Sequence, residues 1–128
     1  MKASELMRGD WIATNRDYMP LAQVEDLIGD SIITKAAEYE SEEIDEQDIK
    51  PIPLTPEILE KNGFKEDSEY NGCYWRPDCS KFCFVKELED WYFAILYKGG
   101  HICISECNYV HELQHALKLC GIEKEITL

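Results

Sequence analysis

The sequence contains no long apolar run. A helix needs about 18 consecutive hydrophobic residues to cross a bilayer, and no such run occurs in the sequence. The first residues, Met1–Glu5, also lack the apolar core of a secretion signal. We therefore expect a soluble, cytoplasmic protein with no membrane partner.

Basic residues are scarce. The 128 residues include 13 lysines and arginines against 26 aspartates and glutamates, so the net charge is −13. A surface of this sign repels the phosphate backbone, and direct binding to nucleic acid is disfavoured. Two interpretations stay open: the charge serves solubility, or the protein imitates nucleic acid and competes for a partner that normally binds it.

Several catalytic and metal-binding motifs are missing. No Gly-x-Ser-x-Gly elbow, phosphate-binding loop or dinucleotide fingerprint occurs. The 6 cysteines all lie in the second half of the chain, and no two of them have the Cys-x-x-Cys spacing of a zinc knuckle. In a cytoplasmic protein, such cysteines are expected to be small buried residues or metal ligands rather than disulfides.

Residues 1–50 are expected to form one small β lobe. Short β-type segments alternate with turn residues, and a large aromatic residue, Trp11, opens the first of them. Gly29–Asp30 lies between two such segments and predicts a hairpin. The expected strands include Trp11–Thr14, Leu21–Ile28 and Ser31–Ala37. Four or five short strands in this length are typical of a small SH3-like barrel.

An acidic segment closes this lobe. Its acidic residues are Glu38, Glu40, Glu42, Glu43, Asp45, Glu46 and Asp48. Repulsion among these side chains predicts a solvated loop or an edge strand. The same residues are the candidate interaction surface for a protein partner. A calcium loop is not indicated, because the Asp-x-Asp-x-Asp-Gly order is missing.

Residues 51–128 are expected to form an α-β-β-β-β-α lobe, either with a core of its own or with one core shared with the first lobe. Thr55 is a typical N-cap for a short helix, and Gly63 is a typical residue to end it. The expected strands are Gly72–Arg76, Lys81–Glu87, Trp91–Lys98 and His101–Glu106. Gly99–Gly100 predicts that the last two strands form a hairpin.

A terminal helix is expected between Asn108, as its N-cap, and Gly121, which follows its last residue. Its apolar stripe consists of Val110, Leu113, Ala116, Leu117 and Cys120. The stripe would cover the antiparallel meander of the second lobe. The fold class expected for the whole chain is α+β, with two lobes.

The terminal helix contains the sequence His111-Glu112-Leu113-Gln114-His115, which matches the H-E-x-x-H pattern of zinc proteases. His111 and His115 would bind zinc, and Glu112 would act as the general base of a small hydrolase. The apolar stripe predicts instead that both histidines face outward. In that interpretation they bind no metal and the chain needs no cofactor.

A third zinc ligand is hard to supply. Only 13 residues follow His115, and the acidic candidates among them are Glu123 and Glu125. His101 begins a strand that would place it far from the outward face of the helix. We therefore favour the interpretation without metal and without a catalytic residue, and keep zinc hydrolysis as the alternative.

The chain resembles a family of small, acidic, uncharacterised proteins encoded in bacteriophages, prophages and mobile elements of anaerobic gut bacteria. The resemblance rests on Met1–Leu6 with Gly9–Trp11, on Pro51–Phe64 and on Tyr109–Gln114. It implies a cytoplasmic accessory protein and supplies no catalytic residue.

Composition and resemblance together predict a non-enzymatic protein-interaction module. Its acidic, aromatic-bearing surface would dock on a host or phage protein, and inhibition of a host factor or of a defence system is one role that such docking would serve.

Overall fold

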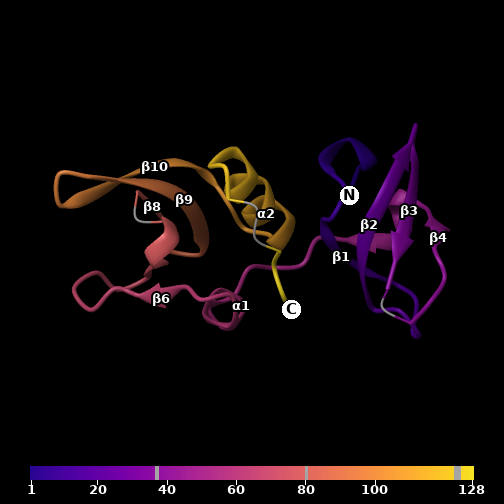
Figure 1. Cartoon of the computed structure of the whole chain (residues 1–128), viewed down its shortest axis with the longest axis horizontal. Coiled ribbons are helices and arrows are strands. Elements are labelled where there is room, and N and C mark those ends of the chain that lie inside the picture. Colours follow the sequence, from indigo (N-terminus) through magenta and orange to yellow (C-terminus); the bar gives the residue numbers. More distant parts are fainter. Residues whose placement is uncertain (37, 80, 123–124) are drawn as a thin grey trace. The chain divides into compact units, whose positions relative to one another are not determined.

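The computed structural model describes residues 1–36, 38–79, 81–122 and 125–128. Internal contacts divide the chain into unit 1, Met1–Ile52, and unit 2, Pro53–Leu128 (Figure 1). The fold class is α+β, as expected: each unit contains a five-stranded antiparallel sheet, and both described α-helices belong to unit 2. None of the described helices has the length and apolar character required to span a membrane.

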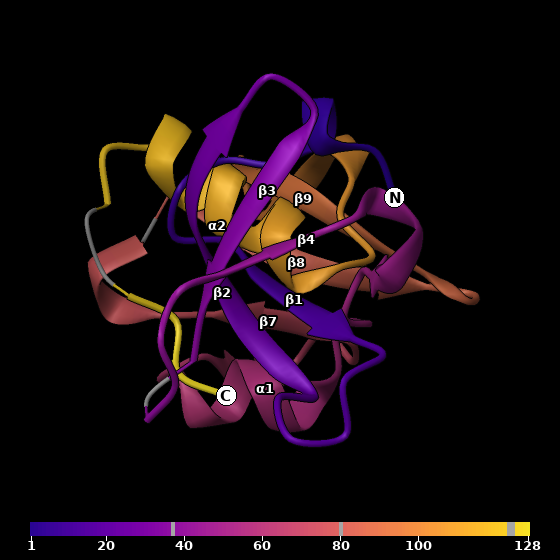
Figure 2. The ribbon, with the colours of Figure 1, turned by 90° about the vertical axis from the view of Figure 1, so that its right-hand side faces the viewer.

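Unit 1 is a curled antiparallel sheet with the strand order β4-β3-β2-β1-β5 (Figure 2). The strands are β1 (Trp11–Thr14), β2 (Leu21–Ile28), β3 (Ser31–Lys35), β4 (Glu42–Ile44) and β5 (Ile49–Lys50). Single 3₁₀ turns occur at η1 (Ala3–Glu5) and η2 (Glu46–Asp48). The Gly29–Asp30 hairpin is confirmed, since Ile28 pairs with Ser31. The third strand ends at Lys35, and residue 37 lies outside the described residues.

The apolar core of unit 1 takes one branched residue from every strand. These residues are Ile12, Val24, Ile32, Ile44 and Ile49, and the N-terminal segment adds Ala3 and Leu6. Successive side chains of a strand point to opposite faces. Each short strand can therefore pack one face against this core while its other face carries polar residues.

Truncation of this core should destabilise unit 1 strongly. Ile32 is fully buried, and Ile32→Ala is expected to lower the free energy of unfolding by about 2–5 kcal/mol, because it removes apolar contacts and leaves a cavity. On the same hairpin, Ile28 is 65% exposed, and Ile28→Ala should cost no more than about 0.5 kcal/mol. Urea unfolding monitored by circular dichroism measures both; equal effects would contradict the assigned core.

Unit 2 contains two helices and a second sheet with the order β10-β9-β8-β7-β6. Its elements are α1 (Pro56–Lys61), β6 (Lys65–Glu66), β7 (Cys73–Trp75), η3 (Pro77–Cys79), β8 (Phe82–Glu87), β9 (Asp90–Tyr97), β10 (Gly100–Glu106) and α2 (Val110–Leu119). Strands β7 to β10 correspond to the four expected strands. The two-residue strand β6 is an addition that is too short to leave a sequence pattern.

The helix ends of unit 2 follow local sequence signals, with one exception. Thr55 Oγ1 accepts the Ile58 N–H, and after α1 the chain passes through Gly63 at φ +88°, as expected. The prediction that Asn108 caps α2 is wrong, because the N-cap is Tyr109. Asn108 Oδ1 instead accepts the N–H of Trp91 at 2.8 Å and ties the start of α2 to β9.

The sheet of unit 2 is strongly coiled. Along its register, Phe82 of β8 pairs with Ile95 of β9, which pairs with Ile102 of β10. Glu87 is five residues beyond Phe82 on β8, so a flat sheet would place it about 17 Å along the strands from that row. Its carboxylate nevertheless lies 3.4 Å from the ring nitrogen of His101, which neighbours Ile102.

Local backbone features accompany this coil. A β-bulge interrupts the β9–β10 register between Cys103 and Ser105, and bulges increase the local twist. Gly72 has φ +81°, and a Cβ there would lie 3.0 Å from the carbonyl oxygen of Lys86, so any other residue would be strained at this position. The Tyr70 hydroxyl donates to the carbonyl of Gly99 at 2.8 Å, which joins the loop before β7 to the β9–β10 turn.

Strand β10 is an edge of this sheet and carries exposed apolar side chains. Ile102 and Ile104 are each about half exposed, and β9 adds Ile95, Leu96 and Tyr97 beside them. Such an edge can pair with the same edge of another molecule.

Ile104→Lys is expected to reduce self-association at high concentration, because a lysine on an edge strand blocks pairing. Light scattering of the purified protein measures the effect. Leu119→Lys replaces an 88% exposed leucine on α2 and serves as the control. An equal effect of both substitutions would mean that added charge, and not the β10 edge, controls association.

Candidate functional site

The two histidines of the H-E-x-x-H sequence do not both face outward. His111 is only 7% exposed, so the prediction is wrong for this residue. Its ring stacks on Tyr109, with 6.0 Å between centroids and 11° between planes, and meets His115 edge to face at 5.6 Å. His115 is partly exposed.

Glu112 has a structural contact that the sequence reading missed. Its Oε1 accepts the backbone N–H of Asn108 at 3.1 Å, which satisfies a donor just before the first turn of α2. Among the described residues, one group of three side chains has the spacing of metal ligands, and it includes none of His111, Glu112 and His115. Of the acidic candidates for a third ligand, Glu125 is exposed and Glu123 lies outside the described residues.

The three side chains with the spacing of metal ligands, the three-ligand group, are Glu87, His101 and Cys103. Their ligand atoms all lie within 4.8 Å of one another. Glu87 Oε1 is 3.4 Å from His101 Nε2 and 4.0 Å from Cys103 Sγ. His101 and Cys103 are two residues apart on β10, so their side chains share a face. Glu87 reaches them from β8 because the sheet is coiled.

Burial raises the pKa of the Cys103 thiol, and the nearby Glu87 carboxylate raises it further. The pKa values of the Cys73 and Cys83 thiols are also raised, mainly by burial. Cys73 and Cys83 form an apolar cluster with Val85 and Ala94. These environments keep the thiols protonated at neutral pH, and none of the three has the lowered pKa of an activated nucleophile.

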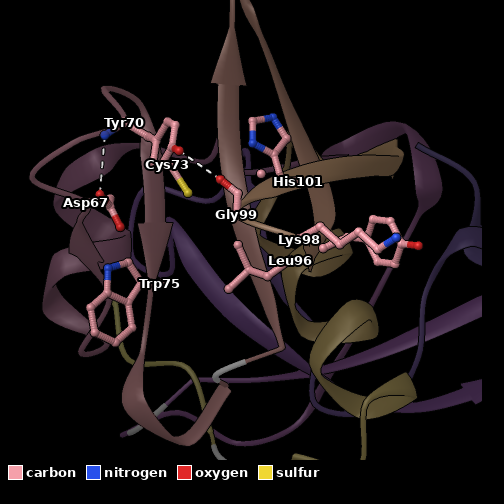
Figure 3. A pocket seen from close by; sticks show the side chains of 10 residues that line it. Asp67, Tyr70, Cys73, Trp75, Leu96, Lys98, Gly99 and His101 are labelled. Carbon is pink, nitrogen blue, oxygen red and sulfur yellow. Dashed lines mark hydrogen bonds between the residues drawn. The ribbon is translucent and has the colours of Figure 1, made fainter.

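A cavity of about 450 Å³ adjoins the three-ligand group (Figure 3). Its wall combines apolar and aromatic side chains with a few polar groups: Asp67, Tyr70, Cys73, Trp75, Leu96, Tyr97, Lys98 and His101, with Gly99 and Gly100. In Figure 3 the Tyr70 hydroxyl reaches Gly99 across one end of the cavity. The volume is suited to a small molecule, and His101 belongs to both the cavity wall and the three-ligand group.

The acidic segment of unit 1 forms an edge strand with its flanking turns, which is one of the two forms predicted for it. Four of its residues make contacts within unit 1. Glu42 binds the Tyr18 hydroxyl at 2.6 Å, and Arg16 at 3.4 Å; Glu43 binds Ser31, Glu46 binds the Ala3 N–H and Asp48 binds Asn15. For the side chains of Glu38, Glu40 and Asp45, the described part of the chain supplies no hydrogen bond or ion pair.

Two exposed tyrosines lie beside the acidic segment. The rings of Tyr18 and Tyr39 meet edge to face with 5.5 Å between centroids, and each ring is about half exposed. Glu38 and Glu40 flank Tyr39 in sequence, and the hydrogen bond to Glu42 raises the pKa of Tyr18. The sequence alone could not pair these rings, because Tyr18 and Tyr39 lie in different loops.

No family model matches the chain, and neither a curated protein nor a solved structure was found to be similar to it.

The buried thiol of Cys107, beside α2, gives a pH-dependent prediction. Burial, and secondarily Glu112, raises its pKa in the folded state. Above the pKa of about 8.5 of an unfolded cysteine, the unfolded chain therefore binds fewer protons at this position, and the Cys107 thiol should contribute a loss of stability of about 1.4 kcal/mol per pH unit. Cys107→Ala should show a shallower decline between pH 8.5 and 10 in denaturant titrations. If the stability of both proteins falls equally with pH, the raised pKa of Cys107 in the folded state is contradicted.

Proposed function

We propose that the protein is a non-enzymatic interaction module whose acidic, tyrosine-bearing surface binds a basic segment of a partner protein. The pair of half-exposed rings of Tyr18 and Tyr39 beside the acidic segment carries the proposal. Tyrosine is enriched among the residues that dominate binding energy, because its large rigid ring loses little entropy on binding. The partly exposed pair supplies the apolar contact that a purely charged surface lacks.

Charge selects the partner. Unit 1 carries 13 acidic and 5 basic residues, a net charge of −8, whereas unit 2 carries 13 and 8, a net charge of −5. Carboxylates with no hydrogen bond or ion pair among the described residues, such as Glu38 and Glu40, remain available for a lysine or arginine of the partner. Complementary charge of this kind accelerates association and rejects acidic competitors.

The topology of unit 1 supports a finer proposal, that unit 1 is a small SH3-like barrel. Its strands follow the order β4-β3-β2-β1-β5, with a single 3₁₀ turn, η2, directly before the last strand. Folds of this kind host many unrelated binding functions, so the proposal concerns architecture and does not itself identify a ligand.

The sequence resemblance adds a cellular context to the proposal. In this context the protein is a cytoplasmic accessory protein of a phage or mobile element, and its partner is a host or phage protein that normally binds nucleic acid. A basic nucleic-acid-binding surface is attracted to the same charge that the phosphate backbone presents.

The alternative, a small zinc-dependent hydrolase centred on His111, Glu112 and His115, stays a prediction. The hydrogen bond from the Asn108 N–H to Glu112 gives this carboxylate a role at the start of α2, and no observation in the described residues favours the hydrolase over the interaction module.

A random peptide display library, selected on the immobilised full chain, tests the proposal. Enriched peptides should be rich in lysine and arginine. Calorimetry should show that Tyr18→Ala and Tyr39→Ala each weaken their binding by about tenfold or more, because each change removes an aromatic anchor. Glu38→Gln with Glu40→Gln should weaken binding less and should flatten its dependence on salt.

Matched controls come from unit 2. Tyr97→Ala removes an equally exposed tyrosine, and Glu89→Gln removes an exposed carboxylate; both should leave binding unchanged. Tyr18→Phe separates the ring from its hydrogen bond to Glu42. Enrichment of neutral or acidic peptides, or binding that is insensitive to both tyrosines, would reject the proposal.

A further inference from the structure

We propose that Glu87, His101 and Cys103 form a binding site for a divalent zinc-type ion. The site lies in unit 2, outside the H-E-x-x-H sequence and outside the acidic segment. It is independent of the docking surface proposed for unit 1, so either proposal can fail without the other.

The chemistry of the three side chains points to zinc. A carboxylate oxygen, an imidazole nitrogen and a cysteine sulfur are the three ligand types that zinc proteins use. Calcium and magnesium take oxygen ligands, so a set with one sulfur and one nitrogen disfavours both. The borderline-soft character of Zn²⁺ suits such a mixed set.

The spacing of the ligand atoms fits the same ion. Tetrahedral zinc with bonds of about 2.0–2.3 Å holds its ligand atoms about 3.3–3.8 Å apart. Glu87 Oε1 and His101 Nε2 are already 3.4 Å apart, and Glu87 Oε1 and Cys103 Sγ are 4.0 Å apart. All three ligand atoms lie within 4.8 Å of one another, and rotation of the exposed Glu87 and Cys103 side chains can shorten the remaining separations.

The position of the group permits an ion to enter and to keep a free coordination position. Glu87 and Cys103 are exposed and His101 is partly exposed. Three protein ligands leave the fourth tetrahedral position to water or to a small ligand, as in catalytic zinc sites. Because His101 also lines the cavity of about 450 Å³, an ion held here would lie beside this cavity.

Bound metal would also connect distant parts of the sheet. Glu87 ends β8, whereas His101 and Cys103 belong to the edge strand β10, and β9 lies between these strands. An ion that binds only the folded state stabilises it in proportion to the logarithm of its free concentration. Zinc should therefore raise the midpoint of thermal unfolding.

Titration of the metal-free full chain tests the site, with Co²⁺ as a spectroscopic probe and then Zn²⁺ as a competitor. We expect one ion per chain and an ultraviolet thiolate-to-cobalt charge-transfer band that zinc abolishes. Cys103→Ser should remove the band, and Cys103→Ser, His101→Gln and Glu87→Gln should each weaken zinc binding by about 100-fold or more, because each removes a ligand. Circular dichroism verifies that each variant is folded, and any of the three that is folded suffices for the test.

Two control variants separate this site from other donors in α2 and at its end. Cys120→Ser removes a partly buried cysteine, and His115→Gln breaks the H-E-x-x-H pair; both should bind cobalt and zinc like the wild type. Loss of binding in His115→Gln, unchanged binding in Cys103→Ser, or absence of stoichiometric binding at micromolar zinc would each overturn the proposal.

Discussion

The coil of the second sheet is the constraint on which the candidate site depends. In a flat sheet, the row of Phe82, Ile95 and Ile102 would lie about 17 Å along the strands from Glu87. Coiling brings the carboxylate of Glu87 to 3.4 Å from His101 on the far side of β9. The hydrogen bond from Tyr70 to Gly99 joins two other distant segments across the same curl. The approach of Glu87 to His101 and Cys103 is therefore a consequence of the curvature.

Strands β4 and β10, each at an edge of its sheet, differ in character: β4 is charged and β10 is apolar. Strand β4 presents Glu42 and Glu43, which bind Tyr18 and Ser31 within unit 1, whereas β10 presents Ile102 and Ile104. A charged edge resists pairing with other strands, and an apolar edge invites it. The acidic segment thus combines a folding role, through residues such as Glu42 and Glu46, with the exposed charge of its remaining carboxylates.

Sequence patterns predicted those features that depend on neighbouring residues. Thr55 and Gly63 delimit α1, and Gly29–Asp30 forms its hairpin, because capping and turn geometry are local. The candidate site could not be found in this way. His101 and Cys103 share a strand face that the sequence does suggest, but Glu87 joins them only through register and coil. Conversely, His111 and His115 form a familiar local motif, yet His111 is buried and Glu112 binds the start of its own helix.

X-ray absorption spectroscopy of the zinc-loaded full chain tests most directly whether the coil assembles these three side chains. We expect one sulfur at about 2.3 Å, from Cys103, with nitrogen and oxygen ligands at about 2.0–2.2 Å, and loss of the sulfur in Cys103→Ser. A shell of nitrogen and oxygen alone, or one with two or more sulfurs, would show that zinc binds elsewhere and would contradict the account.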